Sequence, residues 1–309
     1  MLRFYCFLIS LIPAVLWGQS VMLPIRSDSI LIMQHLKAIT KTNGYRNYKN
    51  LPLLHQTAEY IFSAFQQYAD TVYYQPYQVN GVTYKNVICR LESANNRPLV
   101  VIGAHYDVCG DQEGADDNAS GVVGLLELVR ILSKEKLSYP VEIVAYCLEE
   151  PPFFRTESMG SYIHAKSLYD AKTPVYGMVA LEMIGYFDDR AKSQSYPVKV
   201  MKVAYGRTGD FILLAQKIGA GTFVRNFSEG FKNLATIDAK NLKAPSKIEG
   251  IDFSDHLNYW KFGYDALMVT NTAFYRNHNY HQISDTMETL DISKMMKVID
   301  TTVSAIKGI

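Results

Sequence analysis

Apolar residues recur at helical spacing between residues 28 and 68, with an interruption at Thr42-Asn43-Gly44. This pattern predicts two consecutive helices. Residues 73–78 and 82–91 alternate between apolar and polar positions around Asn80-Gly81, a dipeptide typical of tight hairpin turns. The described pattern therefore predicts two helices followed by a pair of antiparallel strands.

Further along the chain, strand patterns alternate with helix patterns. Four short runs rich in apolar and β-branched residues are typical of strands in the buried middle of a sheet: 99–103, 141–146, 175–181 and 266–269. Residues 121–132 predict a buried helix, and residues 292–306 predict an amphipathic one. We expect a three-layer α/β/α sandwich around a mixed, mostly parallel central sheet. The polar stretches 188–197 and 226–250 are expected to be loops that shape a substrate pocket.

The start of the sequence has the order of a secretory signal. A basic start is followed by an apolar stretch that runs to Trp17, and then by the small residues Gly18 and Ser20. We expect residues 1–20 to be a signal peptide and residues 21–309 to form a single domain, secreted or periplasmic and without stable membrane insertion. A retained membrane anchor is the alternative, although the stretch is short for a span of about 20 residues.

The composition is that of a globular protein with a large core. Of 309 residues, 48% are hydrophobic and 20% are charged, and the formal net charge is +1. Basic residues are scattered among acidic ones along the sequence, and they form no run that would neutralise phosphates. Nucleic acid is therefore not an expected partner.

Three cysteines remain once Cys6 is removed with the signal. These are Cys89, Cys109 and Cys147, an odd number that allows at most one disulfide within the chain. Cys109 and Cys147 lie close in sequence to the ionisable residues discussed next, and they are expected either to pair or to stay as inert thiols. No motif makes either one a nucleophile.

Ionisable residues follow four of the predicted strands at the points where the strands end. They comprise His105, Asp107 and the pair Asp116-Asp117 after the first strand, Glu149-Glu150 after the second, Glu182 after the third, and His278 and His281 after the last. The carboxyl ends of parallel strands meet at one edge of a sheet. Burying so many carboxylates together requires a compensating positive charge, for which a divalent metal is suited. Histidine nitrogen and carboxylate oxygen favour zinc first, then manganese or cobalt.

Six motifs occur in a fixed order from about residue 86 to the end of the chain. They are His105-Tyr-Asp107, Gly114-Ala-Asp-Asp-Asn-Ala-Ser-Gly121, Glu149-Glu150, Gly160-Ser161, Ser254-Asp-His256 and His281-Gln-Ile-Ser-Asp-Thr286. Each motif alone is common, but the ordered set is not. The set resembles the di-zinc exopeptidase family, which includes secreted bacterial leucyl aminopeptidases, glutamate carboxypeptidase and glutaminyl cyclase.

The resemblance implies a ligand set for two zinc ions per chain. Asp117 would bridge both metals. His105 and Glu182 would complete the first metal position, and Glu150 and His281 would complete the second.

The resemblance also implies roles for three residues that are not ligands. Glu149 would be the general base, which takes a proton from the water that attacks the scissile carbonyl and returns it to the leaving amine. Asp107 would fix the tautomer of His105, and Asp285 would act similarly near His281.

Two positions depart from the family pattern. Glu182 stands where many members have aspartate, so this ligand is one methylene longer. Ile251 stands where some aminopeptidases have a tyrosine that stabilises the developing oxyanion. In this chain the oxyanion would be stabilised by another tyrosine or by the metals alone. The candidate tyrosines are Tyr280, Tyr186 and Tyr106.

The predicted function is that of an aminopeptidase, which removes residues from the amino ends of peptide substrates. The alternative is a single-zinc glutaminyl cyclase acting on N-terminal glutamine, with which the segment Phe253-Ser-Asp-His256 is compatible. His105 together with the complete loop 114–121 favours hydrolysis. A third hypothesis, a binding scaffold with a decayed site, requires a missing ligand, and the sequence contains all of them.

Overall fold

The structure is a computed structural model, and it describes residues 26–69, 71–234, 236–246 and 248–309. The predicted signal peptide, residues 1–20, lies outside this part of the chain. Within the described part, no helix combines the length and the apolar character that a membrane span needs.

Two helices and a hairpin begin the described chain, as the sequence predicts. α1 (Ser29–Thr40) starts after Asp28, whose side chain accepts hydrogen bonds from the first free backbone N–H groups of the helix. α2 (Leu51–Gln66) follows. β1 (Thr71–Val79) and β2 (Val82–Leu91) then pair antiparallel across Asn80-Gly81, where both residues have positive φ, as the predicted tight turn requires.

An eight-stranded sheet forms the middle layer, in the order β1-β2-β4-β3-β5-β8-β6-β7. Strands β4, β3, β5 and β8 are mutually parallel, while β1, β2 and β6 each enter antiparallel pairings. The strands after the hairpin are β3 (Leu99–His105), β4 (Val141–Tyr146), β5 (Val175–Glu182), β6 (Ile212–Lys217), β7 (Ala239–Ala244) and β8 (Ala266–Thr270). The predicted mixed, mostly parallel sheet is confirmed.

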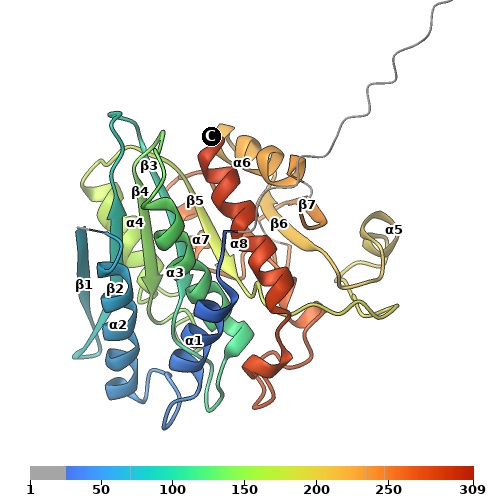
Figure 1. Cartoon of the computed structure of the whole chain (residues 1–309), viewed down its shortest axis with the longest axis horizontal. Coiled ribbons are helices and arrows are strands. Elements are labelled where there is room, and N and C mark those ends of the chain that lie inside the picture. Colours follow the sequence, from blue (N-terminus) through green and yellow to red (C-terminus); the bar gives the residue numbers. More distant parts are fainter. Residues whose placement is uncertain (1–25, 70, 235, 247) are drawn as a thin grey trace, which may run out of the picture.

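Helices cover both faces of this sheet (Figure 1). α1, α2, α3 (Gly121–Leu132), α6 (Thr222–Asn233) and α8 (Ile292–Lys307) lie on one face, and α4 (Gly160–Asp170) and α7 (His256–Lys261) lie on the other. Successive strand residues serve opposite layers, since Val100 and Ile102 pack in one core cluster and Leu99 and Val101 in the other. Both faces of the central strands are therefore buried, which explains their continuous apolar runs.

The prediction of a loop over residues 226–250 is wrong. The second half of α6 and all of β7 lie in this stretch. α6 is polar on average, but Phe223, Phe227 and Phe231 repeat every four residues and are buried along one side. β7 is an edge strand with partly exposed lysines and asparagine, so it lacks the apolar run of a central strand.

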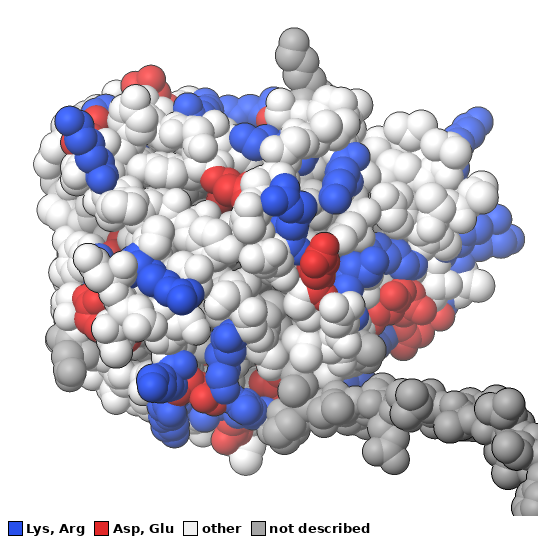
Figure 2. All heavy atoms as spheres, turned by 90° about the horizontal axis from the view of Figure 1, so that it is seen from above, with Lys and Arg blue, Asp and Glu red and all other residues white. Residues whose placement is uncertain are grey.

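Charge is mixed over the molecular surface. On the face shown in Figure 2, basic and acidic side chains are interspersed among uncharged ones. The short helix α5 (Met201–Tyr205) stands away from the sheet beside β7, at the end of a loop that contains the predicted loop 188–197. This loop lies close to the carboxyl end of β8, since Ser195 donates a backbone hydrogen bond to Tyr275.

Candidate metal centre

The carboxyl ends of the central parallel strands bring the predicted ligands together. His105 is the last residue of β3, and Glu182 is the last residue of β5. Glu150 follows β4, and His281 follows β8. Asp117 lies in the kinked segment η1 (Ala115–Ser120) just before α3, where its own backbone is not helical. All five side chains therefore reach one edge of the sheet from different segments.

Asp117 lies at the centre of this cluster, between the two histidines. Its Oδ1 atom is 3.3 Å from Nε2 of His105, and its Oδ2 atom is 3.2 Å from Nε2 of His281. Glu182 completes the first group, with Oε2 3.5 Å from Nε2 of His105. Glu150 completes the second group, with Oε2 3.2 Å from Nε2 of His281. The two oxygens of Asp117 thus face two separate groups of nitrogen and carboxylate oxygen.

Several ligand atoms in this cluster are buried without a hydrogen bond from any described residue. They are Oδ2 of Asp117, Oε1 of Glu150 and Nε2 of His281. A buried polar atom without a partner costs about 1–3 kcal/mol, and more when the group is charged. A divalent cation would satisfy all three atoms at once, so the residues fit a metal.

The electrostatics of the cluster lead to the same conclusion. Burial, reinforced by Glu150 and Glu182, raises the pKa of Glu149 well above its ordinary value. Burial and the charge of Asp117 raise the pKa of Glu150 to about 7. Burial lowers the pKa of His105, but the carboxylates of Glu182 and Glu149 outweigh burial and leave this pKa well above its ordinary value. The protein side chains alone thus leave an excess of negative charge, which a cation would neutralise.

Glu149 lies beside the cluster but outside both ligand groups. Its Oε2 atom is 4.0 Å from Nε2 of His105, farther than the oxygens of Asp117 and Glu182. The side chain is buried and lines the same cavity as Asp117, Glu150 and His281. This position suits a group that exchanges protons with a molecule in the cavity.

Two further carboxylates hold the segments that carry the ligands. Asp107 accepts the backbone N–H groups of both Glu149 and Glu150 at 3.1 Å. Nδ1 of His105 lies 3.2 Å from the backbone carbonyl of Asp107 and 3.5 Å from its Oδ1 atom, so both the backbone and the side chain of Asp107 lie beside this ring. Asp285 was expected near His281. Instead its carboxylate accepts the backbone N–H groups of Asp116 and Asp117, and it fixes the η1 segment.

The sequence did not reveal the roles of Asp116 and Arg46. Asp116 accepts hydrogen bonds from the side chains of Asn271 and Asn277 and from two backbone N–H groups, so it is a structural residue and has no oxygen left for a metal. The fully buried Arg46 lies between α1 and α2, and its guanidinium donates to the backbone carbonyls of Tyr106, Glu113 and Gly114. It therefore ties the ends of the loop between His105 and η1, although no local pattern marks it.

The backbone is unusual on several sides of the cluster. Leu148 precedes Glu149, Met183 follows Glu182, and both have positive φ, as does His281 itself. Residues with side chains rarely adopt this conformation, and such positions gather at functional sites. The strand ends here turn sharply, which directs their carboxylates and imidazole into one place.

Of the three tyrosines considered as oxyanion donors, Tyr280 is the one that faces the cavity. Its ring stacks on His281 with 3.8 Å between ring centroids, and it lines the cavity with Glu149. Tyr106 is fully buried and donates to the backbone carbonyl of Lys85.

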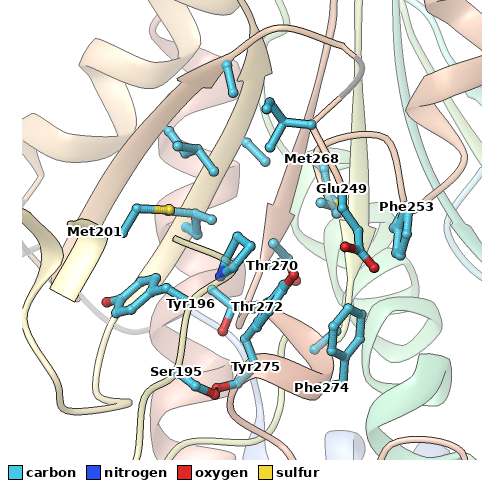
Figure 3. Close-up of a pocket in the computed structure, with 18 of the residues that line it drawn as sticks. Ser195, Tyr196, Met201, Glu249, Phe253, Met268, Thr270, Thr272, Phe274 and Tyr275 are labelled. Carbon is cyan, nitrogen blue, oxygen red and sulfur yellow. Dashed lines mark hydrogen bonds between the residues drawn. The ribbon is translucent and has the colours of Figure 1, made fainter. Parts of the chain in front are cut away.

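Two neighbouring cavities lie beside the ligand cluster. The first, of about 290 Å³, is lined by four of the five predicted ligands, all except His105, and by aromatic side chains that include Phe154 and Tyr280. The second, of about 210 Å³, is almost entirely apolar and lies over β6, β7 and β8. Figure 3 shows this second cavity, with Tyr196 and Met201 on one side and Phe253 and Phe274, which also line the first cavity, on the other.

Comparison with known sequences agrees with this geometry. Residues 86–306 match peptidase family M28. The chain belongs to this family. It is 42% identical over 273 residues to the uncharacterized protein YfbL of Escherichia coli K12, covering 86% of this chain and 83% of that protein. It is 25% identical to leucine aminopeptidase 1 of Uncinocarpus reesii, over 69% of this chain and about half (51%) of that protein.

Solved structures of two kinds share the fold of this M28 chain. The LapA aminopeptidase of Legionella pneumophila matches 90% of this chain and 70% of its own, with a TM-score of 0.70 and 19% identity. Tannerella forsythia glutaminyl cyclase matches 91% of this chain and 99% of its own, with a TM-score of 0.65 and 18% identity. The fold therefore accommodates hydrolysis and cyclisation, and the site must distinguish them.

Proposed function

We propose that this M28 protein is a zinc aminopeptidase with two zinc ions per chain. The observation that carries the proposal is the position of Asp117, whose two carboxylate oxygens face His105 and His281 at 3.3 and 3.2 Å. Each of these groups has its own second carboxylate, Glu182 or Glu150. A site for a single metal needs only one such group.

Charge balance supports two metals as well. Four carboxylates line the cavity next to the cluster, those of Asp117, Glu149, Glu150 and Glu182. All four are almost fully buried. Two divalent cations would neutralise four negative charges, whereas one cation would leave two of them uncompensated in a site of low dielectric.

Glu149 would move the proton in the proposed reaction. Zinc, when bound, supplies a Lewis acid that polarises the scissile carbonyl and lowers the pKa of water. Glu149 takes the proton from the attacking water and delivers it to the nitrogen of the departing amine. Its carboxylate lines the cavity beside both ligand groups, where it can reach a water molecule held there.

The apolar cavity would receive the side chain of the substrate's first residue. It shares Glu182, Phe253, Ala273 and Phe274 with the cavity next to the predicted ligands, so the two spaces are adjacent. Its remaining walls are mainly aliphatic and aromatic, which favours large apolar side chains over small or charged ones. The name of the fungal relative, leucine aminopeptidase, agrees with this preference.

The test is a panel of substrates for the purified protein. We expect hydrolysis of leucyl and phenylalanyl arylamides, slower hydrolysis of the alanyl compound, and none when the amino group is acetylated. Ala215→Leu narrows the apolar cavity without altering a ligand, and it should slow the leucyl substrate more than the alanyl one. Conversion of a glutaminyl peptide to a pyroglutamyl peptide, without arylamide hydrolysis, would replace this proposal by the cyclase alternative.

A further inference from the structure

We propose that the Cys109 thiolate is a fourth protein ligand of the metal held by Asp117, Glu150 and His281. The Sγ atom of Cys109, a carboxylate oxygen of Glu150 and a ring nitrogen of His281 all lie within 4.8 Å of one another. This inference rests on the proposed function, because it assumes that a metal occupies the Glu150 and His281 position.

An independent observation at the same place points to a ligand. Glu150 is 4% exposed, and its Oε1 atom has no hydrogen-bond partner among the described residues. Nε2 of His281 is likewise buried without one. The thiol is therefore next to two atoms that already require a cation, and it is not an isolated cysteine.

The backbone on both sides of Cys109 is held in place. The N–H group of Val108 donates to the carbonyl of Arg46 at 3.3 Å, and the carbonyl of Gly110 accepts from the side chain of Asn47 at 2.8 Å. Arg46 and Asn47 belong to the connection between α1 and α2, so a segment distant in sequence fixes the backbone on either side of the cysteine. A ligand whose backbone is fixed loses little entropy when it binds.

The other cysteines of the described chain differ from Cys109 in exposure. Cys89 and Cys147 are buried, whereas Cys109 is partly exposed, and all three are free thiols. Of the two alternatives considered for Cys109 and Cys147, a disulfide or unpaired thiols, the described structure has the unpaired thiols. Among the described residues, the cavity walls include Glu150 and His281 but not Cys109, so the thiol would approach the metal from outside the substrate space.

A thiolate would make the two metal positions unequal. The position of His105, Asp117 and Glu182 would keep three protein ligands, the number typical of an open catalytic zinc. The position of Asp117, Glu150, His281 and Cys109 would have four, the number typical of zinc that is held permanently. Sulfur also favours zinc over magnesium or manganese at this position.

Cobalt spectroscopy tests the ligand directly. The full chain is stripped with a chelator and reloaded with Co²⁺, because a cobalt–thiolate bond gives an intense charge-transfer absorption in the near ultraviolet that nitrogen and oxygen ligands do not. We expect this band in the wild type and in Cys89→Ser, the matched control, and its loss in Cys109→Ser. We also expect Cys109→Ser to bind one of the two metal ions at least about 10-fold more weakly than the wild type does.

Cobalt content and leucyl arylamide hydrolysis are measured on the same samples, so that failure of the thiolate ligand can be distinguished from failure of the proposed function. Two bound cobalt ions with hydrolysis but no thiolate band, or a band that persists in Cys109→Ser, would overturn the thiolate ligand and leave the aminopeptidase proposal intact. A wild type that binds no cobalt and hydrolyses no arylamide would overturn both.

Discussion

Glu149 and Glu150 are neighbours in the chain, but their carboxylates have different surroundings. Oε2 of Glu150 lies 3.2 Å from Nε2 of His281, within a ligand group. Oε2 of Glu149 lies 4.0 Å from the nearest histidine nitrogen and lines the cavity. Asp107 holds the backbone N–H groups of both, which fixes this divergence.

Amide variants of the two glutamates should therefore behave differently. Glu149→Gln keeps the size of the side chain but cannot accept a proton, so turnover should fall about 10²- to 10⁴-fold while metal content stays near that of the wild type. Glu150→Gln should lose metal. Turnover and elemental analysis of both variants check this, and equal behaviour of the two would contradict the assigned roles.

Tyr280 lines the cavity and is our proposed donor to the oxyanion, in the role that a tyrosine at the position of Ile251 has in some aminopeptidases. Tyr280→Phe removes the hydroxyl and keeps the ring on His281, so kcat should fall about 10²-fold with little change in KM. Tyr169→Phe, on the exposed surface of α4, is the control and should retain its kcat. An unchanged kcat in Tyr280→Phe would leave the metals alone to stabilise the oxyanion.

The stability of the folded protein should depend on pH through His256. Burial lowers the pKa of this histidine to about 4, and its Nε2 atom lies 2.8 Å from the carbonyl of Ile251. The unfolded state binds the proton below a pH of about 6.5 and the folded state does not, so stability falls as the pH drops. When the pH falls from 7.5 to 5, the free energy of unfolding of the wild type, measured with urea, should decrease by about 2 kcal/mol through this histidine. His256→Gln should lack this decrease. Equal losses in both proteins would exclude this role.

At the scale of elements, the connection between α1 and α2 holds the loop between His105 and η1 in place through the hydrogen bonds of Arg46. Arg46→Met leaves three backbone carbonyls without their donor, so it should lower stability by about 3–5 kcal/mol and reduce zinc content. Arg46→Lys should not restore either, because lysine lacks the planar fork of donors. The exposed Arg225→Met is the control. Thermal unfolding and elemental analysis measure both effects.

The sequence predicted those strands and helices whose apolar residues repeat on the faces that are buried in the core. β3, β4, β5 and β8 are apolar along their length because helices cover both sides, and their ends carry the ligands. β7 and α6 were missed since an edge strand and a largely polar helix have weak patterns. Arg46 and Tyr280 owe their roles to contacts across the fold, which spacing along the chain does not encode.

At the scale of the whole molecule, metal binding and folding should be coupled. The buried carboxylates that follow β4, end β5 and lie in η1 repel one another without cations, and the cluster also includes histidines that end β3 and follow β8. Removal of metal by a chelator should therefore lower the melting temperature, and added zinc should restore it. An unchanged melting temperature after complete removal would show that the cluster is stable without metal.

In the proposed function, two zinc ions act together in one aminopeptidase centre. Its most direct test is a zinc titration of the chelated full chain, with bound zinc counted by elemental analysis and leucyl arylamide hydrolysis followed at each step. The two oxygens of Asp117, facing His105 and His281, predict that binding saturates at two zinc ions per chain and that full activity requires both. Saturation at one zinc ion, with cyclisation of a glutaminyl peptide and no arylamide hydrolysis, would contradict it.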